Sequence, residues 1–548
     1  MDASAAVGKG EYVGMATSKT PGIGAGSGDF SIDELLVDAA YPHPVAHLKL
    51  KQTHVSWVVL TGRFAYKIKK PVRYDFIDAS TLERRRSLCE EELRLNRRFA
   101  PDLYVDVVPI TRRDRHLKVG GPGEPVEFAV RMHEFDPSQE LATQIAQGGV
   151  TPHDMSTFAA QLADWHLRAA VASAPGPFGT FERVRAPMLD NFALLRTHLG
   201  GAAELQLLER LATWTEDSLS KLESLIHSRL RSGMVRECHG DLHTRNVVRW
   251  RQQWLPFDCL EFDPDLRWID VMSDVAFLFM DLMSRRREDL AHEFLSRYLE
   301  ETGDYAGLRL LPLYAAYLAL VRAKVDALGA ETAGLEERQA LEARLAERLA
   351  TAVRFMDAAP AALVIMHGVT ASGKSWLSER LVSTIHAVRI RSDLERKRLA
   401  GIAPLARRIF GVGEGAYNAA TMQRTYERLM ECAESALDGS CRVVIDATFL
   451  DPIHREMFHS LALRRRCPFL IVSCSTDAAT LEARLDSRAH GGLDPSEATR
   501  AVLDHQLRFH RALTAEELAH AVQIDTSRLS LADAGVTAIV ARLDQSVA

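Results

Sequence analysis

The hydrophobic pattern of the first half predicts a small sheet followed by helices. Residues 56–60 (SWVVL) form a short β-rich run, and residues 64–69 (FAYKIK) alternate apolar and polar positions after a Thr-Gly turn. A charged helix is predicted over 79–98 and a further strand over 126–132, after which helical periodicity dominates to about residue 230. This order is typical of an α+β domain with a sheet lobe and a helical lobe.

The second half follows a different pattern. Continuous apolar runs at 362–366 (ALVIM), 443–445 (VVI) and 469–472 (FLIV) are separated by segments with helical periodicity. Runs of this kind are typical of a parallel sheet that is buried on both faces. The sequence therefore predicts an α/β domain with a parallel sheet in this half.

Composition sets the predicted limits of the two domains. The first 30 residues are rich in Gly, Ser and Ala and lack hydrophobic periodicity, which predicts a disordered tail over 1–30. An apolar stripe on a predicted helix, from Leu341 to Val353, ends before Ala358-Ala359-Pro360. We therefore expect one domain over 31–357 and a second over 358–548.

Charge and cysteine content narrow the functional classes. Lys plus Arg number 67 and Asp plus Glu number 73, a net charge of −6, so bulk charge does not indicate nucleic-acid binding. Seven cysteines without a C-x-x-C pair are typical of free thiols in a reducing compartment. Since no apolar run approaches the length of a membrane span, we expect a cytoplasmic protein without a membrane partner. The oligomeric state is not predicted.

A phosphate-binding loop is predicted after the apolar run at 362–366. The segment G-V-T-A-S-G-K-S fits G-x-x-x-x-G-K-[ST] and leads into an amphipathic helix, so its backbone N–H groups and lysine can hold phosphates while its final serine ligates Mg²⁺. Asp446, directly after the run at 443–445, is the expected second carboxylate for the metal. The predicted nucleotide-binding residues are Gly368, Ser372, Gly373, Lys374 and Ser375, with Ser375 and Asp446 as the metal residues.

Two further segments offer groups for an acceptor and for the transferred phosphoryl group. Asp393 and Arg396 follow a predicted strand at 387–390, where this segment also fits a simple helix N-cap. The stretch 481–500 carries arginines around a Gly-Gly pair, which indicates a mobile lid, with a solvated charged helix as the alternative. The arginines expected to act from this lid are Arg484 and Arg488.

These motifs make residues 361–548 resemble the small P-loop kinases of the polynucleotide kinase, gluconate kinase and adenylate kinase type. The run from Asp393 to Arg396 is similar to the D-x-x-R pattern of polynucleotide kinases, and V-I-D-A-T at 444–448 to their second acidic motif. The resemblance implies ATP as the phosphoryl donor, activation of an acceptor hydroxyl by Asp393 and binding of acceptor phosphate by Arg396. It does not identify the acceptor.

The first half carries a second cluster suited to phosphoryl transfer. In H-G-D-L-H-T-R-N, Asp241 can accept the proton of a substrate hydroxyl and Asn246 can hold Mg²⁺, while Asp258, after a predicted hairpin, can bridge metal and phosphates. Lys67 on a strand and Glu92 on the following helix fit the pair that orients the donor phosphates. A solvated strand lysine is the simpler interpretation of Lys67 taken alone.

Residues from about 35 to 330 resemble the aminoglycoside phosphotransferase family, which has a protein-kinase-like fold. H-G-D-L-H-x-x-N matches the catalytic loop of that family, F-D-C-L-E its metal-binding segment, and Asp274 its later D-x-A motif, which implies a structural role for Asp274. The whole chain resembles bacterial proteins that fuse such a domain to a P-loop kinase. It departs from kinases in lacking a G-x-G-x-x-G loop over the phosphates.

The sequence thus predicts an ATP-dependent phosphotransferase with two ATP/Mg²⁺ sites, each acting on a hydroxyl of a small-molecule or nucleotide-like acceptor. Two alternatives stay open. The first domain could be a regulatory nucleotide-binding module, which would leave catalysis to the P-loop domain alone. The P-loop domain could also act on the 5′-hydroxyl of a polynucleotide, with the arginines at 464–466 and 407–408 along a groove, although such residues are more often plain surface charges.

Overall fold

The computed structural model divides into two compact units, each built from segments that are distant in the sequence. The first unit holds the residues up to Thr151 together with Trp165–Ser284 and Ala315–Val353, and the second holds Pro152–Asp164, Arg285–Tyr314 and the chain from Arg354 onward. The predicted tail at 1–30 and the arginines at 407–408 lie, apart from Phe30, outside the described residues. The structure describes residues 30–74, 77–113, 116–357, 360–402, 419–491 and 500–545.

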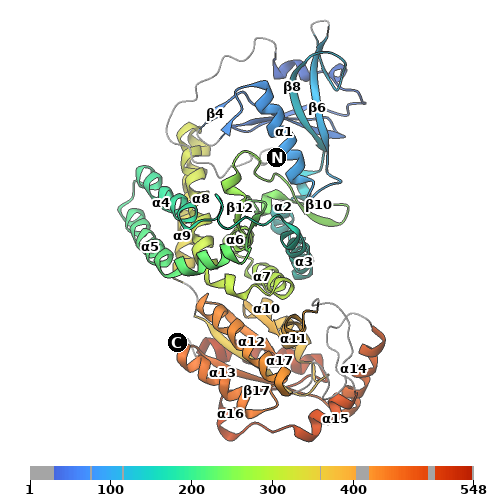
Figure 1. The fold of residues 1–548 in the computed structure, drawn as a ribbon, viewed down its shortest axis with the longest axis vertical. Helices are drawn as coiled ribbons and strands as arrows, with labels where there is room; N and C mark the ends of the chain where they lie inside the picture. The colour runs from blue at the N-terminus through green and yellow to red at the C-terminus, as the bar shows by residue number, and fades with distance from the viewer. Residues whose placement is uncertain are drawn as a thin grey trace. The chain divides into compact units, whose positions relative to one another are not determined.

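A six-stranded antiparallel sheet, in the order β1-β2-β3-β8-β6-β7, begins the first unit (Figure 1). The strands predicted on either side of the Thr-Gly turn are confirmed, because β2 and β3 pair with Leu60 opposite Ala65 around Gly62. Helix α1 (Leu82–Asn96) is capped by Thr81, whose side chain accepts from Arg84 N, and packs on β8, β6 and β3. The strands of this sheet are β1 (Lys49–Gln52), β2 (Ser56–Leu60), β3 (Phe64–Lys69), β6 (Tyr104–Arg113), β7 (His116–Val119) and β8 (Pro125–His133), while β4 (Arg73–Tyr74) and β5 (Ile77–Asp78) pair separately.

The chain between residues 141 and 356 is mainly helical, with short two-stranded pairings β9–β12 and β10–β11. Helix α9 places the predicted leucine stripe on its buried side. The strands here are β9 (Val235–Glu237), β10 (Val247–Trp250), β11 (Gln253–Pro256) and β12 (Trp268–Asp270). The helices are α2 (Leu141–Ala146), α3 (Pro152–Arg168), α4 (Phe181–His198), α5 (Ala202–Arg231), α6 (Val271–Ser284), α7 (Glu288–Thr302), α8 (Leu311–Thr332) and α9 (Leu335–Met356).

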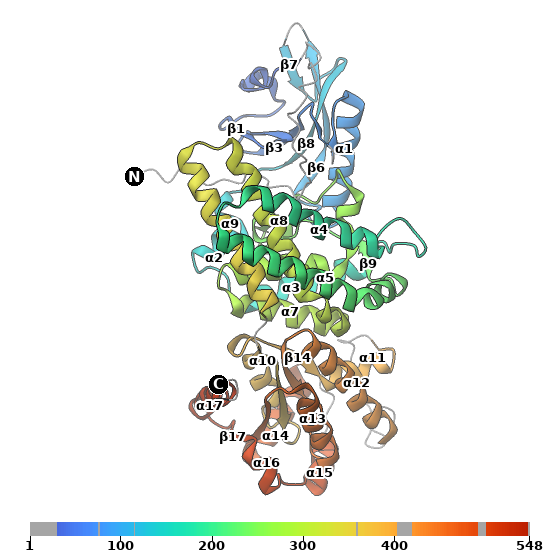
Figure 2. The same ribbon diagram turned by 90° about the vertical axis from the view of Figure 1, so that its left-hand side faces the viewer.

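A five-stranded parallel sheet, in the order β14-β15-β13-β16-β17, forms the core of the second unit (Figure 2). The predicted apolar runs are its central strands, and leucines and isoleucines of α10 and α17 pack against them. The strands are β13 (Ala362–His367), β14 (Ala387–Arg391), β15 (Arg442–Asp446), β16 (Phe469–Ser475) and β17 (Ala521–Asp525). The helices are α10 (Lys374–Thr384), α11 (Ser392–Leu399), α12 (Ala419–Asp438), α13 (Pro452–Arg465), α14 (Ala478–Gly491), α15 (Arg500–Phe509), α16 (Ala515–Ala519) and α17 (Leu529–Gln545).

Helix α7 belongs to this second unit, where it packs against α10 and β14. The fully buried carboxylate of Glu300 accepts a hydrogen bond from Arg389 Nε at 2.6 Å. Residues of α7 and of the segment after it also bond to the backbone of Arg389: its N–H donates to Ser296 Oγ (2.9 Å), and its carbonyl accepts from the Tyr305 hydroxyl (3.1 Å). Residues 285–314 are therefore an integral part of the packing around β14.

The predicted fold class is confirmed: an α+β segment with an antiparallel sheet is followed by an α/β segment with a parallel sheet. Within the described ranges, no helix combines the length and apolar character that crossing a bilayer requires.

Candidate active sites

The first candidate site is the loop that carries Asp241, between β9 and β10. Gly240 has a φ of +84°, and a Cβ there would lie 2.5 Å from Leu266 O, so both backbone conformation and space require glycine. The carboxylate of Asp274 accepts from the backbone N–H groups of His239 (3.1 Å) and Gly240 (2.9 Å). These two bonds fix the backbone immediately before Asp241.

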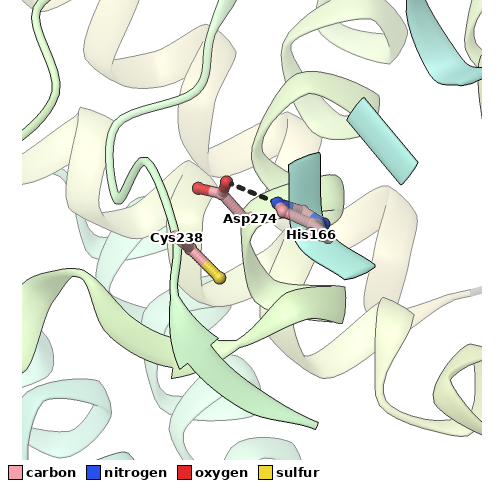
Figure 3. A group of neighbouring side chains, drawn as sticks. All are labelled: His166, Cys238 and Asp274. Carbon is pink, nitrogen blue, oxygen red and sulfur yellow. Dashed lines mark hydrogen bonds and ion pairs between the residues drawn. The ribbon is translucent and has the colours of Figure 1, made fainter. Parts of the chain in front are cut away.

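A buried cluster supports this loop. Ligating atoms of His166, Cys238 and Asp274 lie within 4.8 Å of one another (Figure 3). His166 Nε2 lies 3.1 Å from Asp274 Oδ2, and Cys238 Sγ donates to Ile269 O at 3.6 Å. Because both oxygens of the Asp274 carboxylate already accept hydrogen bonds, we interpret the cluster as a support for the loop rather than a metal site.

Replacing Asp274 by alanine should lower the free energy of unfolding by about 3–5 kcal/mol, since it removes a fully buried acceptor from two N–H groups and from His166. Urea unfolding of the full chain, followed by circular dichroism, measures the change. Asp265→Ala is the matched control, because the Asp265 side chain is one third exposed and pairs with the surface residue Arg183. Equal unfolding midpoints for the two variants would contradict a supporting role for Asp274.

The predicted pair Asp241 and Asn246 lies together in this loop. Asn246 Nδ2 donates to Asp241 Oδ2 at 2.9 Å and to Asp241 O at 3.0 Å. Asp241 Oδ1, by contrast, is buried and accepts no hydrogen bond within the described part of the chain; His243 Nε2 lies 3.6 Å away. The loop therefore presents one carboxylate oxygen that is held and one that can accept a proton.

The predicted donor-side residues also lie together. Lys67 Nζ donates to Glu92 Oε1 at 2.9 Å and to Asp258 Oδ1 at 2.5 Å, and its side chain is only 7% exposed. The simpler interpretation of Lys67 as a solvated strand lysine is therefore wrong. Burial acts to raise the pKa of Glu92, but the ammonium groups of Lys67 and Lys69 outweigh it and lower that pKa to about 2.

Sequence reasoning missed the second half of this ion-pair network. Lys69 Nζ donates to Glu92 Oε2 at 2.5 Å and also to Glu261 Oε1, with all three side chains buried. The strand alternation of F-A-Y-K-I-K, which puts Lys67 and Lys69 on one face, was the available signal. The network joins β3, α1 and the segment after β11, and so orients Lys67 toward Asp258.

The second candidate site is the predicted phosphate loop between β13 and α10. Gly368 has a φ of +139° and Gly373 a φ of +86°, and a Cβ at Gly368 would lie 2.5 Å from Cys474 O. Lys374, the first residue of α10, donates from Nζ to Val369 O at 2.6 Å. The lysine thus lies over the loop at the N-terminus of a helix, where backbone N–H groups and the helix dipole favour an anion.

Asp446 lies at the edge of the sheet where the phosphate loop begins. It ends β15, the strand beside β13, and is buried. Burial raises the pKa of Cys474 to about 12; the charge of Lys374 opposes this rise and the charge of Asp446 adds to it. Asp446 thus ends the strand next to the one that leads into the phosphate loop.

Asp393 and Arg396 form an ion pair on the first turns of α11. Arg396 Nη2 donates to Asp393 Oδ1 at 2.8 Å, and the Arg396 side chain is 6% exposed. The alternative of a plain N-cap does not describe this segment, because Arg391 is the N-cap residue and no side chain caps it. The two residues are joined to each other, beside the carboxyl end of β14.

Arg484 reaches the phosphate loop from α14. Its guanidinium donates to Ala371 O (3.2 Å) and to Thr526 O (2.6 Å). Thr526, which sequence reasoning missed, follows β17 and donates from Oγ1 to Ser372 O at 2.8 Å. The Arg488 side chain, also predicted for the lid, lies outside the described residues.

Oxygen ligands suited to Mg²⁺ are present at both sites. The first offers the amide oxygen of Asn246 and the carboxylate of Asp258, and the second offers the Ser375 hydroxyl and Asp446. Carboxylate, amide and hydroxyl oxygens are the ligands that this cation prefers. The buried, unbonded oxygen of Asp241 adds a negative charge that a cation nearby would offset.

His367, the last residue of β13, should make the P-loop fold sensitive to acid. Burial, followed by the positive charge of Arg455, lowers the pKa of His367 from 6.5 to about 4. Between these values the unfolded chain takes up a proton that the folded chain does not, so stability is complete above pH 6.5 and falls as the pH drops toward 4. In His367→Gln, the loss of unfolding free energy between pH 6.5 and pH 4 should be smaller than in the wild type by up to about 3 kcal/mol.

Urea unfolding of the wild type and of His367→Gln at several pH values in this window checks the expectation. His153→Gln is the control, because His153 is exposed and belongs to the same unit. Identical pH dependence of all three proteins would show that His367 is not the responsible group.

Two family models match the chain in these regions. The model described as "Phosphotransferase enzyme family" matches residues 78–311, and the model described as "AAA domain" matches residues 363–513. The first match contains Asp241 and Asp258, and the second contains Lys374, Asp446 and Arg484. The central loop of each candidate site thus lies within a separate family match, while Lys67 and Thr526 lie outside the matched ranges.

Two mycobacterial proteins align with most of this chain. Rv2004c of Mycobacterium tuberculosis and Mb2027c of Mycobacterium bovis are each 30% identical over 464 residues, covering 84% of this chain and 91% of the relative. Among solved structures, the chain is similar to a choline kinase from Cryptosporidium parvum, with 12% identity and a TM-score of 0.36; the match covers 60% of this chain and 96% of the choline kinase. It is also similar to a gluconokinase from Sinorhizobium meliloti, with 21% identity and a TM-score of 0.24; that match covers 34% of this chain and 97% of the gluconokinase. The chain belongs to this family of bacterial proteins, in which a kinase-like phosphotransferase domain precedes a P-loop kinase domain.

Proposed function

We propose that the protein is an ATP-dependent kinase with two Mg²⁺-assisted sites, each of which transfers the γ-phosphoryl group to a hydroxyl of a small-molecule or nucleotide-like acceptor. The supporting observation is the state of Asp241. Its Oδ2 is held by Asn246, while its buried Oδ1 accepts no hydrogen bond from the described residues. A desolvated carboxylate oxygen held in this way is suited to take the proton of an attacking hydroxyl.

At the kinase-like site, the roles follow from the contacts. Lys67 places a positive charge for the donor phosphates and is oriented by Glu92, while Asn246 and Asp258 would hold the metal. When bound, Mg²⁺ supplies charge neutralisation of the phosphate oxygens. Asp241 accepts the acceptor proton, so catalysis rests on positioning and electrostatics rather than on a covalent intermediate.

At the P-loop site, the backbone N–H groups of the loop and Lys374 hold the donor phosphates, and Ser375 and Asp446 would hold the metal. Arg484, bonded to Ala371 O, adds positive charge beside the loop. Asp393 is the proposed base for the acceptor hydroxyl. All seven cysteines are free thiols, which supports our further proposal of a reducing, cytoplasmic location.

The test is a screen of hydroxyl acceptors with γ-labelled ATP, using the full chain and the single variants Asp241→Ala and Lys374→Ala. The panel includes amino alcohols, sugars, nucleosides, nucleoside monophosphates and a 5′-hydroxyl oligonucleotide. Label transfer to an acceptor that depends on one of the two residues supports the proposal. Release of inorganic phosphate alone across the panel would refute it.

The same screen separates the alternatives. If every transfer requires Lys374 and none requires Asp241, the kinase-like domain is a regulatory nucleotide-binding module. If the oligonucleotide is the acceptor and the rate falls steeply with salt concentration, the P-loop domain acts on polynucleotide ends.

A further inference from the structure

Among the described residues, a buried arginine that makes no side-chain hydrogen bond lies beside the P-loop site. Arg391 is the last residue of β14, and its side chain is 10% exposed. Its Nε is buried and unbonded, and its guanidinium makes no hydrogen bond to any residue that the structure describes. Asp446 Oδ2 lies 4.0 Å from Arg391 Nε, which is beyond hydrogen-bonding distance.

Arg389 shows how the same strand face satisfies a buried guanidinium. Arg389 lies two residues before Arg391 and therefore on the same side of β14. It donates from Nε to Glu300 at 2.6 Å and from Nη1 to Ser375 O at 3.2 Å. Arg391 lies at ion-pair distance from Asp446, but its guanidinium makes no hydrogen bond to a described residue, so its buried N–H groups are available to a ligand.

The position of Arg391 in the sheet indicates which substrate of the P-loop site it would contact. In the parallel sheet Arg391 lies opposite Asp446, and β13, which leads into the phosphate loop, is the next strand beyond β15. The carboxyl ends of these strands share one edge, where ligands of open α/β sheets bind. Asp393, the proposed base for the acceptor hydroxyl, follows two residues later, so Arg391 lies on the acceptor side of the site.

We propose that Arg391 binds an anionic group, a phosphate or a carboxylate, on the acceptor of the P-loop site. Arg396, to which the family resemblance gives this role, is already joined to Asp393. A guanidinium can bind either anion through two parallel hydrogen bonds. The inference rests on the proposed kinase function of this site, and it selects charged acceptors over neutral sugars and amino alcohols.

The experiment titrates inorganic phosphate, and separately acetate, into the full chain saturated with Mg²⁺ and a non-hydrolysable ATP analogue. Because the analogue fills the γ-phosphate position, a further bound anion reports the acceptor side. Isothermal titration calorimetry should show wild-type binding that Arg391→Gln weakens at least tenfold and Arg391→Lys weakens less. Arg464→Gln, which changes an exposed arginine of α13, should bind as the wild type does. The more tightly bound anion assigns the acceptor group.

Each outcome decides the inference. Equal affinities of the wild type and Arg391→Gln for both anions, or no anion binding by the wild type, overturn it. If Arg391→Gln loses Mg²⁺ affinity but keeps its anion affinity, Arg391 acts only by positioning Asp446, and the inference is also overturned. If the analogue itself does not bind in a Lys374-dependent manner, the proposed function of the site fails instead. Thermal unfolding checks the fold of each variant, and Arg391→Lys replaces Arg391→Gln if the latter is unfolded.

Discussion

Alanine in place of Asp241 is expected to slow phosphoryl transfer at the kinase-like site by about 10²–10⁴-fold, the usual contribution of a general base. The variant removes the only carboxylate oxygen of the catalytic loop that is buried and unbonded within the described residues, while Lys67, Glu92 and Asp258 keep their mutual ion pairs. ATP binding at this site should therefore change little. The measurement is the rate of label transfer to the acceptor found in the screen, together with ATP affinity.

Asp102→Ala is the matched control for this prediction, because the Asp102 side chain is 64% exposed and pairs with Arg251 on the surface. It should transfer label as the wild type does. The acceptor must be one that Lys374→Ala phosphorylates at the wild-type rate, so that the kinase-like site is the one measured. If Asp241→Ala transfers label to this acceptor within a few fold of the wild-type rate, Asp241 is not the base.

The second large effect is expected for Lys374→Ala, which should reduce transfer at the P-loop site by about 10²–10³-fold, as the loss of one electrostatic group from a preorganised site does. Lys374 begins α10 and lies over the phosphate loop through its bond to Val369 O. Its loss removes the positive charge proposed to bind the donor phosphates but leaves the glycine backbone of the loop in place. Transfer at the kinase-like site should stay unchanged.

Arg380→Ala provides the control on the same helix, since Arg380 is 44% exposed and pairs with Asp533. It should leave both activities intact. If Asp241→Ala and Lys374→Ala each abolish all ATP turnover, the two sites are not independent, and the activity of each requires the other.

The parts of the fold that local patterns determine were predictable. The alternation at 64–69 predicts β3 with its observed bounds, and the apolar run at 362–366 predicts β13 to within one residue. The phosphate loop is also local, because its glycines are required by the positive φ angles of Gly368 and Gly373. By contrast, β6 (Tyr104–Arg113) was missed; it contains Pro109, which weakens a strand pattern.

What could not be predicted depends on contacts between distant residues. Lys67 meets Asp258 across 191 positions, and Lys69 meets Glu261 across 192. A lysine on a strand has the same local pattern whether it is solvated or buried in an ion-pair network, so only the folded structure distinguishes the two. Arg389 and Arg391 make the same point, since nothing in A-V-R-I-R shows that Arg389 donates a hydrogen bond to a carboxylate and Arg391 does not.

The position of α7 has a consequence for dissecting the protein. Residues 285–311 fall within the phosphotransferase family match, yet they pack with the parallel sheet, where Glu300 neutralises Arg389. A fragment that starts at residue 358 would remove the acidic partner of the buried Arg389 guanidinium, whereas one that starts before α7 would take residues from the phosphotransferase match. The two segments therefore cannot be separated at the end of the family match without breaking this packing, and the activity proposed for each site is best measured by inactivating the other site in the full chain.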